Sequence, residues 1–190
     1  MRTLLMAAAL AAAVLPAAAV HAADYPNKAV RMVIAFTPGG PSDILSRLVG
    51  AKLSERMGQP VVFDNRPGAG GNVAGEIVAT SPADGYTIMI ANNSILAANA
   101  SLYKKMTFNP AKDLVPVVWV ASQPNILVVH PSVPAKSVKD LVAHLKANPG
   151  KLNYASSGSG AAAHLAGELF KSMTKTDMVH IPFKGAAPAI

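Results

Sequence analysis

The sequence predicts an α/β fold in which a largely parallel sheet is covered by helices. The first observation is that short apolar runs alternate with segments whose apolar residues recur at helical spacing. The second is that the connections are short and rich in glycine and proline, as at residues 37–41 and 82–85. Such alternation is typical of parallel strands buried between helices.

The first set of elements follows this pattern from residue 29 onward. Strands are predicted at residues 29–36, 59–65 and 87–91, each an apolar run that ends in a turn or loop. Between the first two strands we expect a helix capped by Ser42 or Asp43 and stopped by Gly58. Further helices are predicted at residues 72–79 and 92–103.

A second set of elements begins near Gln123 and Pro124, which we interpret as a crossover between two lobes. Residues 114–122 and 125–130 are rich in valine and indicate two more β-segments. Ser137 is expected to cap a helix that runs to about residue 146. A strand at 152–155, a helix at 161–173 and a strand at 178–183 complete the prediction.

The N-terminus has the features of a cleaved secretory signal over residues 1–22. Arg2 precedes an apolar, alanine-rich run at residues 4–20, and Val20-His21-Ala22 places small residues at the positions that a signal peptidase reads. A transmembrane anchor is the alternative, but Pro16 interrupts a run that is short for a spanning helix of roughly 20 apolar residues. We therefore expect an exported protein, in the periplasm of a bacterium.

Composition excludes several classes of site and partner. The chain has 190 residues, a formal net charge of +7 and no cysteine, so thiolate metal sites and cysteine nucleophiles are ruled out. Its lysines and arginines are scattered and form no basic stripe interleaved with aromatic residues, so we expect no nucleic-acid partner. The positive charge either steers anionic solutes toward the protein or reflects solvated surface lysines.

Three loops at predicted strand ends have the composition of anion sites, because ligands of parallel sheets bind where strands feed helix N-termini. The first contains Thr37, Pro38, Gly39 and Gly40 and reaches Asp43, which suits capping or binding an amino or hydroxyl group. The second, residues 65–72, offers Arg66 to a carboxylate or uses it to hold the loop. The third, residues 156–160, combines serine hydroxyls with glycine amides before a helix. A plain turn is the alternative at the first loop.

Enzyme interpretations of these loops are weaker. Gly158, Gly160 and Ala163 match a relaxed dinucleotide fingerprint, but Asp177 precedes the next strand instead of following it. Residues 156–160 do not spell the nucleophile elbow of a serine hydrolase. His164 and Glu168 share a helix face and suggest a metal pair, but no third ligand accompanies them, so we expect no metal.

The sequence resembles the Bug-type substrate-binding proteins of tripartite tricarboxylate transporters. The resemblance rests on segments that occur in family order across the chain after residue 24: YPNK at 25–28, FTPGGPSD at 36–43, NRPGAGG at 65–71, PADGYT at 82–87, NPGKLNY at 148–154, SSGSG at 156–160, His164-Leu165, and HIPFKGAAP at 180–188.

This resemblance implies a periplasmic-binding-protein type II fold with two hinged lobes and mostly parallel sheets. It divides the chain into the signal peptide at 1–22, a first lobe at 23–123 and the start of a second lobe at 124–190. Because family members continue beyond this point, it also implies a truncated chain with an incomplete second lobe. The implied function is capture of a small carboxylate by a monomer that has no catalytic residue and no cofactor. Its partners would be that solute and the membrane permease subunits.

The site residues implied by the resemblance come from both lobes, with Lys184 and Gly185 close to the lobe crossing. They are Thr37, Pro38, Gly39, Gly40, Asp43, Gly71, Asn92, Asn93, Ser94, Ser157, Gly158 and Ser159. The alternative function is a secreted α/β enzyme that uses residues 158–163 to bind a phosphate-bearing cofactor.

Overall fold

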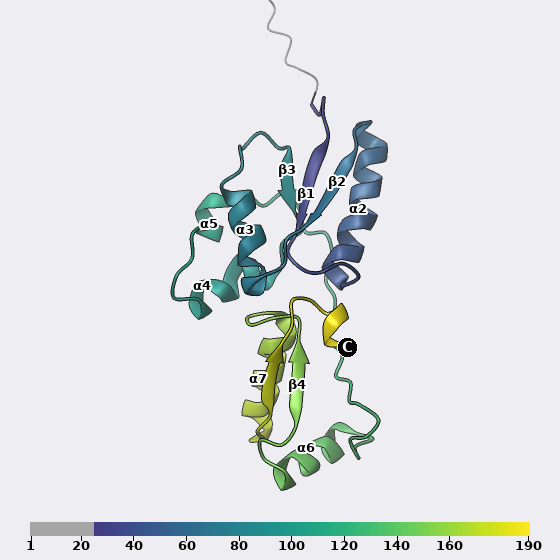
Figure 1. The fold of residues 1–190 in the computed structure, drawn as a ribbon, viewed down its shortest axis with the longest axis vertical. Helices are drawn as coiled ribbons and strands as arrows, with labels where there is room; N and C mark the ends of the chain where they lie inside the picture. Colours follow the sequence, from purple (N-terminus) through teal and green to yellow (C-terminus); the bar gives the residue numbers. More distant parts are fainter. Residues whose placement is uncertain (1–24) are drawn as a thin grey trace, which may run out of the picture.

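The computed structural model describes residues 25–190 and contains two parallel sheets, one above the other in Figure 1. The larger sheet has three strands in the order β2-β1-β3, and the smaller pairs β4 with β5. The predicted signal peptide lies outside the described residues. Within the described part of the chain, no helix is long and apolar enough to cross a membrane.

The larger sheet is built from two crossovers: the first leads from the central strand to one edge, and the second leads from that edge back across to the other. Their elements follow in order: β1 (Val30–Ile34), α2 (Pro41–Met57), β2 (Val61–Asn65), α3 (Asn72–Ala79) and β3 (Thr87–Met89). β1 pairs with β2 from Val30↔Val61 to Ile34↔Asn65, and with β3 from Arg31↔Thr87 to Val33↔Met89. Because such crossovers are right-handed, α2 and α3 flank the sheet on opposite sides (Figure 1). The α/β prediction is confirmed.

The core of this unit forms on β1, which is central and covered on both faces. Met32, Val33 and Ile34 are each at most 1% exposed. Burying a side chain of this size contributes about 1.5–3 kcal/mol. Ala35 and Phe36 extend the core beyond the end of the strand, where they pack with Ala74, Ile95 and Phe108. The core therefore holds the loop that follows β1 in a fixed place.

The rest of the first unit consists of short turns and helices. The 3₁₀ turn η1 (Ala69–Gly71) precedes α3, and a single π-helical turn, η2 (Ser94–Ala98), runs directly into α4 (Asn99–Leu102). The short helix α5 (Pro110–Asp113) follows, capped by the side chain of Asn109. The helical prediction for residues 92–103 is confirmed over most of its length.

The start of α2 differs from the prediction that Ser42 or Asp43 caps it. The N-cap is Gly40 and the helix begins at Pro41, whose fixed φ suits the first helical position. The Asp43 carboxylate, within the first turn, accepts a hydrogen bond from the Gly39 amide at 3.0 Å. Asp43 therefore supports the helix start from inside the helix instead of capping it.

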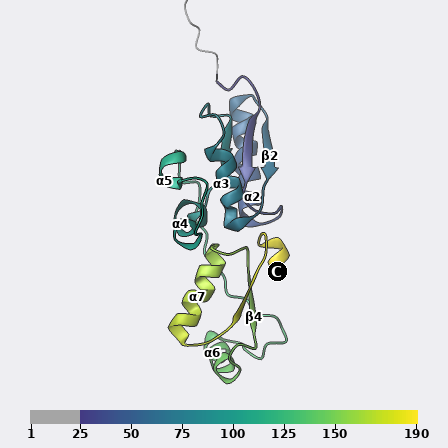
Figure 2. The same ribbon diagram turned by 60° about the vertical axis from the view of Figure 1, so that its left-hand side comes forward.

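The prediction of β-segments at residues 114–122 and 125–130 is wrong. These residues form no strand, because no neighbouring strand pairs with them among residues 25–190. Apart from Leu114, which packs against the core, their side chains are exposed, including Val117 at 88% and Trp119 at 82%. The valine-rich composition favours extended backbone, but a strand also needs a partner. The segment instead runs from α5 to the second unit (Figure 2).

The second unit is a single strand–helix–strand crossover with a preceding helix. Helix α6 (Val138–Ala147) begins at its predicted cap, since the Ser137 hydroxyl accepts a hydrogen bond from the Asp140 amide at 3.1 Å. Then follow β4 (Asn153–Ser156), α7 (Ala162–Thr174), β5 (Val179–Pro182) and the short turn η3 (Ala187–Ala189). β4 and β5 pair in parallel from Asn153↔Val179 to Ser156↔Pro182. The chain end returns to the junction of the two units (Figures 1 and 2).

Candidate functional site

A cleft of about 210 Å³ lies where the carboxyl ends of both sheets face each other. Its walls come from the loops after β1, β2, β4 and β5 and from the end of α4. Lys184 is the only charged residue among its described lining residues. The lining residues are Phe36, Gly68, Ala69, Gly70, Gly71, Tyr103, Ser157, Gly158, Ser159, Pro182, Phe183 and Lys184.

The two units contact each other through one side-chain hydrogen bond, one backbone hydrogen bond between Thr37 and Lys184, and close packing at glycines. The Tyr103 hydroxyl donates to the carbonyl oxygen of Ser159 at 3.2 Å. A Cβ on Gly70 would lie 2.4 Å from that same carbonyl oxygen, and one on Gly160 would lie 2.4 Å from Oδ1 of Asn99. Only glycine permits approaches this close. The cleft is therefore narrow because glycines line both of its sides.

Asn99 organises the first-unit side of this contact. It is fully buried, and its side-chain amide donates to the Gly70 carbonyl at 3.1 Å and to Oδ1 of Asn72 at 2.7 Å. This fixes the backbone of the glycine loop, where Ala69 adopts φ +47° and Gly70 adopts φ +62°. A left-handed alanine costs roughly 1–2 kcal/mol, so the surrounding structure holds the loop in this shape.

The loop after β4 forms the opposite wall and resembles an anion nest. Its first anchor is Ser156, 2% exposed, whose hydroxyl oxygen accepts a hydrogen bond from the Gly158 amide at 3.1 Å. The Gly160 amide donates to Nδ1 of His164 at 3.1 Å. Among residues 25–190, the amides of Ser157 and Ser159 make no hydrogen bond. These two N–H groups and the serine hydroxyls are the donors that the wall offers.

The loop after β1 lies beside the cleft but contributes only Phe36 to its lining. The Thr37 amide donates to the Lys184 carbonyl at 3.2 Å, and a Cβ on Gly185 would lie 2.0 Å from Thr37 Oγ1. Gly39 and Gly40 lie close to Ala187 and Ala186. The predicted contacts Thr37, Pro38, Gly39 and Gly40 are thus brought near the cleft and packed against the C-terminal segment.

Asp43 lies at the centre of a polar network instead of facing the cleft. It is 3% exposed, and its carboxylate accepts two hydrogen bonds from Arg47, both at 3.0 Å, and one from Asn65 at 3.0 Å. The Gly39 amide is the fourth donor. The Arg47 hydrogen bonds do most to lower the pKa of Asp43, to about 2. With these donors in place, Asp43 ties helix α2 to the end of β2.

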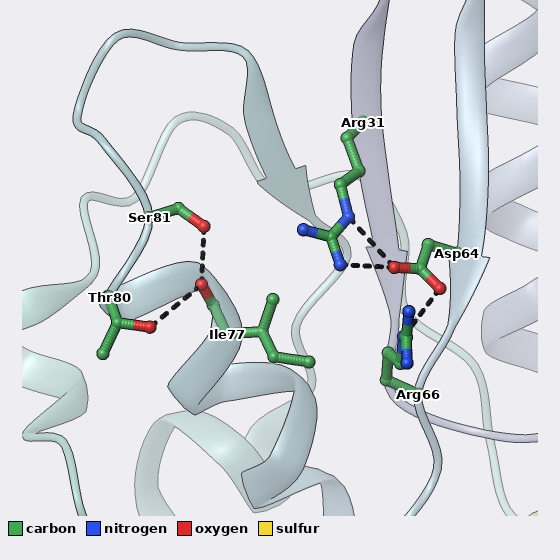
Figure 3. Close-up of polar contacts among 6 residues, drawn as sticks. All are labelled: Arg31, Asp64, Arg66, Ile77, Thr80 and Ser81. Carbon is green, nitrogen blue, oxygen red and sulfur yellow. Dashed lines mark hydrogen bonds and ion pairs between the residues drawn. The ribbon is translucent and has the colours of Figure 1, made fainter.

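Arg66 pairs within its own sheet (Figure 3). Its Nε donates to Asp64 at 2.8 Å, and Arg31 of β1 binds the other oxygen of the same carboxylate. The hydrogen bond from Arg31, more than any other contact, lowers the pKa of Asp64. The sequence allows Arg66 either to bind a carboxylate solute or to hold its own loop. In the structure it pairs with Asp64 and holds the loop.

The remaining predicted contacts divide between the cleft and the interior. Gly71, Ser157, Gly158 and Ser159 line the cleft together. Ser94 is fully buried inside the first unit, and Asn92 accepts a hydrogen bond from the Ile95 amide at 3.3 Å. Asn92, Asn93 and Ser94 are absent from the described lining.

The residues considered for metal and cofactor binding have other contacts. Glu168 accepts hydrogen bonds from the Tyr154 hydroxyl at 2.6 Å and from Lys171 at 3.2 Å. Asp177 precedes β5 and lies 3.8 Å from Lys171. Residues 25–190 contain no group of three or more acidic or histidine side chains placed to hold a metal ion.

Sequence reasoning missed several lining residues. Tyr103 belongs to no motif, and only its distance from Ser159 in the fold reveals it. The sequence predicts Phe36 to be a buried strand residue. Pro182, Phe183 and Lys184, which form one side of the cleft, belong to the last family motif, HIPFKGAAP. The presence of that motif is the sequence feature from which these three residues could have been predicted as part of the site.

Comparison with known proteins places this chain in a family of transporter receptors. A family model described as "Tripartite tricarboxylate transporter family receptor" matches residues 45–190. Protein BugT of Bordetella pertussis is 39% identical over 175 residues, which covers 92% of this chain and 54% of BugT.

Two solved structures are similar in both fold and sequence. R. palustris Rpa4515 with adipate is 44% identical, with a TM-score of 0.85, and the match covers 87% of this chain and 56% of that one. MatC from Rhodopseudomonas palustris with bound malate is 30% identical, with a TM-score of 0.82 and coverage of 87% and 56%.

These similarities define the fold as that of periplasmic binding proteins. The chain belongs to the tripartite tricarboxylate transporter family of receptors, among its Bug-type members. The recognition from sequence motifs and the predicted fold type are confirmed. The chain spans about half the length of the relatives that it matches.

Proposed function

We propose that this chain captures a small carboxylate in the cleft between its two units, as a periplasmic receptor without catalytic activity. The observation that carries the proposal is the cleft's lining, in which glycine and serine backbone from two sheets faces a single charged group, Lys184. Amide donors, hydroxyls and one ammonium bind a carboxylate strongly enough for capture and weakly enough for release. Similar proteins carry adipate and malate in their structures.

The proposed solute contacts are Gly71, Ser157, Gly158 and Ser159, joined by Tyr103 and Lys184. The two units act as the lobes, residues 23–123 and 124–190, and the segment that joins them, residues 114–130, acts as the hinge. Binding draws the lobes together because the solute contacts both walls at once. The loop of Thr37, Pro38, Gly39, Gly40 and Asp43 supports the first lobe's side, and Asn92, Asn93 and Ser94 support it from within.

The proposal extends to export and partners. The signal peptide at residues 1–22 directs a monomer to the periplasm, where it hands its solute to the membrane permease subunits. Membership in the transporter receptor family supports this role.

Isothermal titration calorimetry of the 190-residue chain tests the function. Adipate, malate and citrate are titrated in separate runs, with ATP and NAD as competitors from the alternative class. We expect heat from at least one carboxylate and none from the nucleotides. Binding of the nucleotides alone would replace the receptor with a cofactor-dependent enzyme.

A further inference from the structure

Helices α2 and α7 begin with the same contact, made by two chemically different side chains. In α2, the Asp43 carboxylate accepts a hydrogen bond from the amide of Gly39, four residues earlier, at 3.0 Å. In α7, Nδ1 of His164 accepts one from the amide of Gly160, also four residues earlier, at 3.1 Å. Each glycine directly precedes the N-cap of its helix. The contact therefore fixes the end of each strand-to-helix loop.

The two contacts respond differently to protons. Asp43 stays ionised throughout the neutral range, since its pKa lies at about 2. An imidazole nitrogen accepts a hydrogen bond only while it carries no proton, so the contact with Gly160 requires a neutral His164 protonated at Nε2. The N-cap of α7 is Ala161, which offers no side-chain acceptor in its place.

A second histidine holds the beginning of the same loop. Nε2 of His180 lies 2.6 Å from the Ser156 hydroxyl oxygen. The same oxygen accepts a hydrogen bond from the Gly158 amide. The rings of His180 and His164 stack with centroids 4.1 Å apart and 23° between their planes. Residues 157–160 are thus tied at both ends to one stacked pair of imidazoles.

We propose that His164 and His180 are positioning residues of the cleft: a neutral His164, together with His180, holds residues 157–160 in the shape that presents the Ser157 and Ser159 amides to a carboxylate. Protonation of His164 removes the acceptor for Gly160 and places a positive charge at the positive end of α7. The loop then loosens and the solute is released more readily as the pH falls. The proposal rests on the proposed function, because it assigns the loop a carboxylate.

The surroundings of His180 favour its neutral state. Burial, followed by the charge of His164, lowers the pKa of His180. The other titratable groups around the rings are Tyr154 of β4, Glu168 and Lys171 of α7, and Asp177 before β5. Glu168 is engaged by Tyr154 and Lys171, and Lys171 also lies 3.8 Å from Asp177. The charge of Glu168 acts in the opposite direction and raises the pKa of His180, but burial is the larger effect.

Protonation of His164 also has an effect on binding in the opposite direction. An added positive charge on His164 also attracts an anion, which would tighten binding at low pH. That attraction is weakened by salt, since the Debye length is about 8 Å at physiological ionic strength. The direction of the pH dependence therefore separates loop positioning from simple attraction.

Calorimetric titration of adipate between pH 5.5 and 8 at 0.15 M salt tests the proposal in matched variants. In His164→Asn, Oδ1 keeps an acceptor near the position of Nδ1 but does not titrate. On acidification we expect the affinity of the wild type to fall about tenfold more than that of His164→Asn. A tenfold change in affinity is what the loss of one hydrogen bond produces. His164→Leu should bind weakly at every pH. His144→Gln, on α6, should follow the wild type.

Two results would overturn the proposal. One is a His164→Asn variant with the pH profile of the wild type, and the other is a wild type that binds more tightly at pH 5.5 than at 7.5. Changes in the charge of adipate itself affect all four proteins equally, so the comparison with His164→Asn removes them.

A measurement without ligand keeps the two proposals distinguishable. In a pH titration followed by NMR, the Gly160 amide should shift with the midpoint of the His164 ring protons, and its response should vanish in His164→Asn. A Gly160 amide that does not follow the ring refutes the positioning role. If no carboxylate binds at any pH while the amide follows the ring, the proposed function fails and the positioning contact stands.

Discussion

The hydroxyl of Tyr103 donates a hydrogen bond to the carbonyl oxygen of Ser159, 3.2 Å away, and so joins residues that lie 56 positions apart. Tyr103 directly follows α4, whereas Ser159 lies in the loop after β4. This is the polar side-chain contact that bridges the cleft, and burial raises the pKa of Tyr103. The geometry of the cleft depends on it.

Removing this hydroxyl should weaken solute binding more than it weakens the fold. In Tyr103→Phe the two units lose one neutral hydrogen bond, worth about 0.5–1.5 kcal/mol, so carboxylate affinity should fall by roughly two- to tenfold. Calorimetry measures the change. Tyr25→Phe is the matched control, because its hydroxyl donates to the Gly85 carbonyl at 2.8 Å, away from the cleft. Equal losses of affinity in both variants would contradict the role of Tyr103.

A methyl group on Gly70 should prevent the close approach of the two walls. Gly70→Ala combines a left-handed φ of +62° with a Cβ placed 2.4 Å from the Ser159 carbonyl oxygen. Gly58→Ala isolates the first effect, because Gly58 has φ +66° and nothing within 4 Å of its Cβ. Both variants should lose roughly 1–2 kcal/mol of unfolding free energy. Only Gly70→Ala should also lose carboxylate affinity, and full affinity in that variant would show that the cleft tolerates a wider gap.

Asp43 should make the fold sensitive to acid in a defined range. Its pKa of about 2 in the folded state, against an ordinary 3.8, corresponds to about 2 kcal/mol of stability. Since the folded pKa is the lower one, this contribution is complete above pH 4 and is lost as the pH falls through about 2. The difference in unfolding free energy between wild type and Asp43→Asn, measured by urea denaturation, should therefore shrink below pH 4.

The control for Asp43 is a carboxylate on the same helix. Glu55 pairs with Lys52 at 2.6 Å but is 66% exposed, so Glu55→Gln should change stability little at any pH. If Asp43→Asn and Glu55→Gln had the same stability profile, the network around Asp43 would not be a structural tie.

The segment that joins the two units, residues 114–130, should expose the chain's single tryptophan to solvent. Trp119 is 82% exposed, although its indole N–H donates to the Ala121 carbonyl at 2.9 Å. Its fluorescence should be red-shifted, and iodide should quench it nearly as well as it quenches N-acetyltryptophanamide. A blue-shifted emission that resists iodide would mean that residues 114–130 are covered.

Most of the fold could be predicted because local signals and tertiary structure agree. Glycine and proline mark the loops at residues 37–41 and 82–85, and the apolar run on β1 identifies the central strand. The prediction failed at residues 114–130, where valine content indicated strands. An extended segment becomes a strand only if another strand, elsewhere in the chain, pairs with it. Local composition does not show whether such a partner exists.

The candidate site was predictable only where it consists of motifs. Ser157, Gly158 and Ser159 belong to a glycine–serine loop before a helix, which is a recognisable anion site. Tyr103 and Asn99 lie in an ordinary helical segment, and their importance comes from facing Gly160 and Ser159 across the junction. Arg66 offered two interpretations that only its distance to Asp64 could separate.

The central claim is that a carboxylate binds between the two glycine-lined walls. Mapping backbone amide shifts by ¹⁵N NMR during a titration with adipate tests this most directly. We predict that the largest saturable shifts fall on Gly70, Gly71, Ser157 and Ser159, on both sides of the cleft. Saturable shifts confined to residues away from these loops, or the absence of any shift at the two serines, would contradict the account.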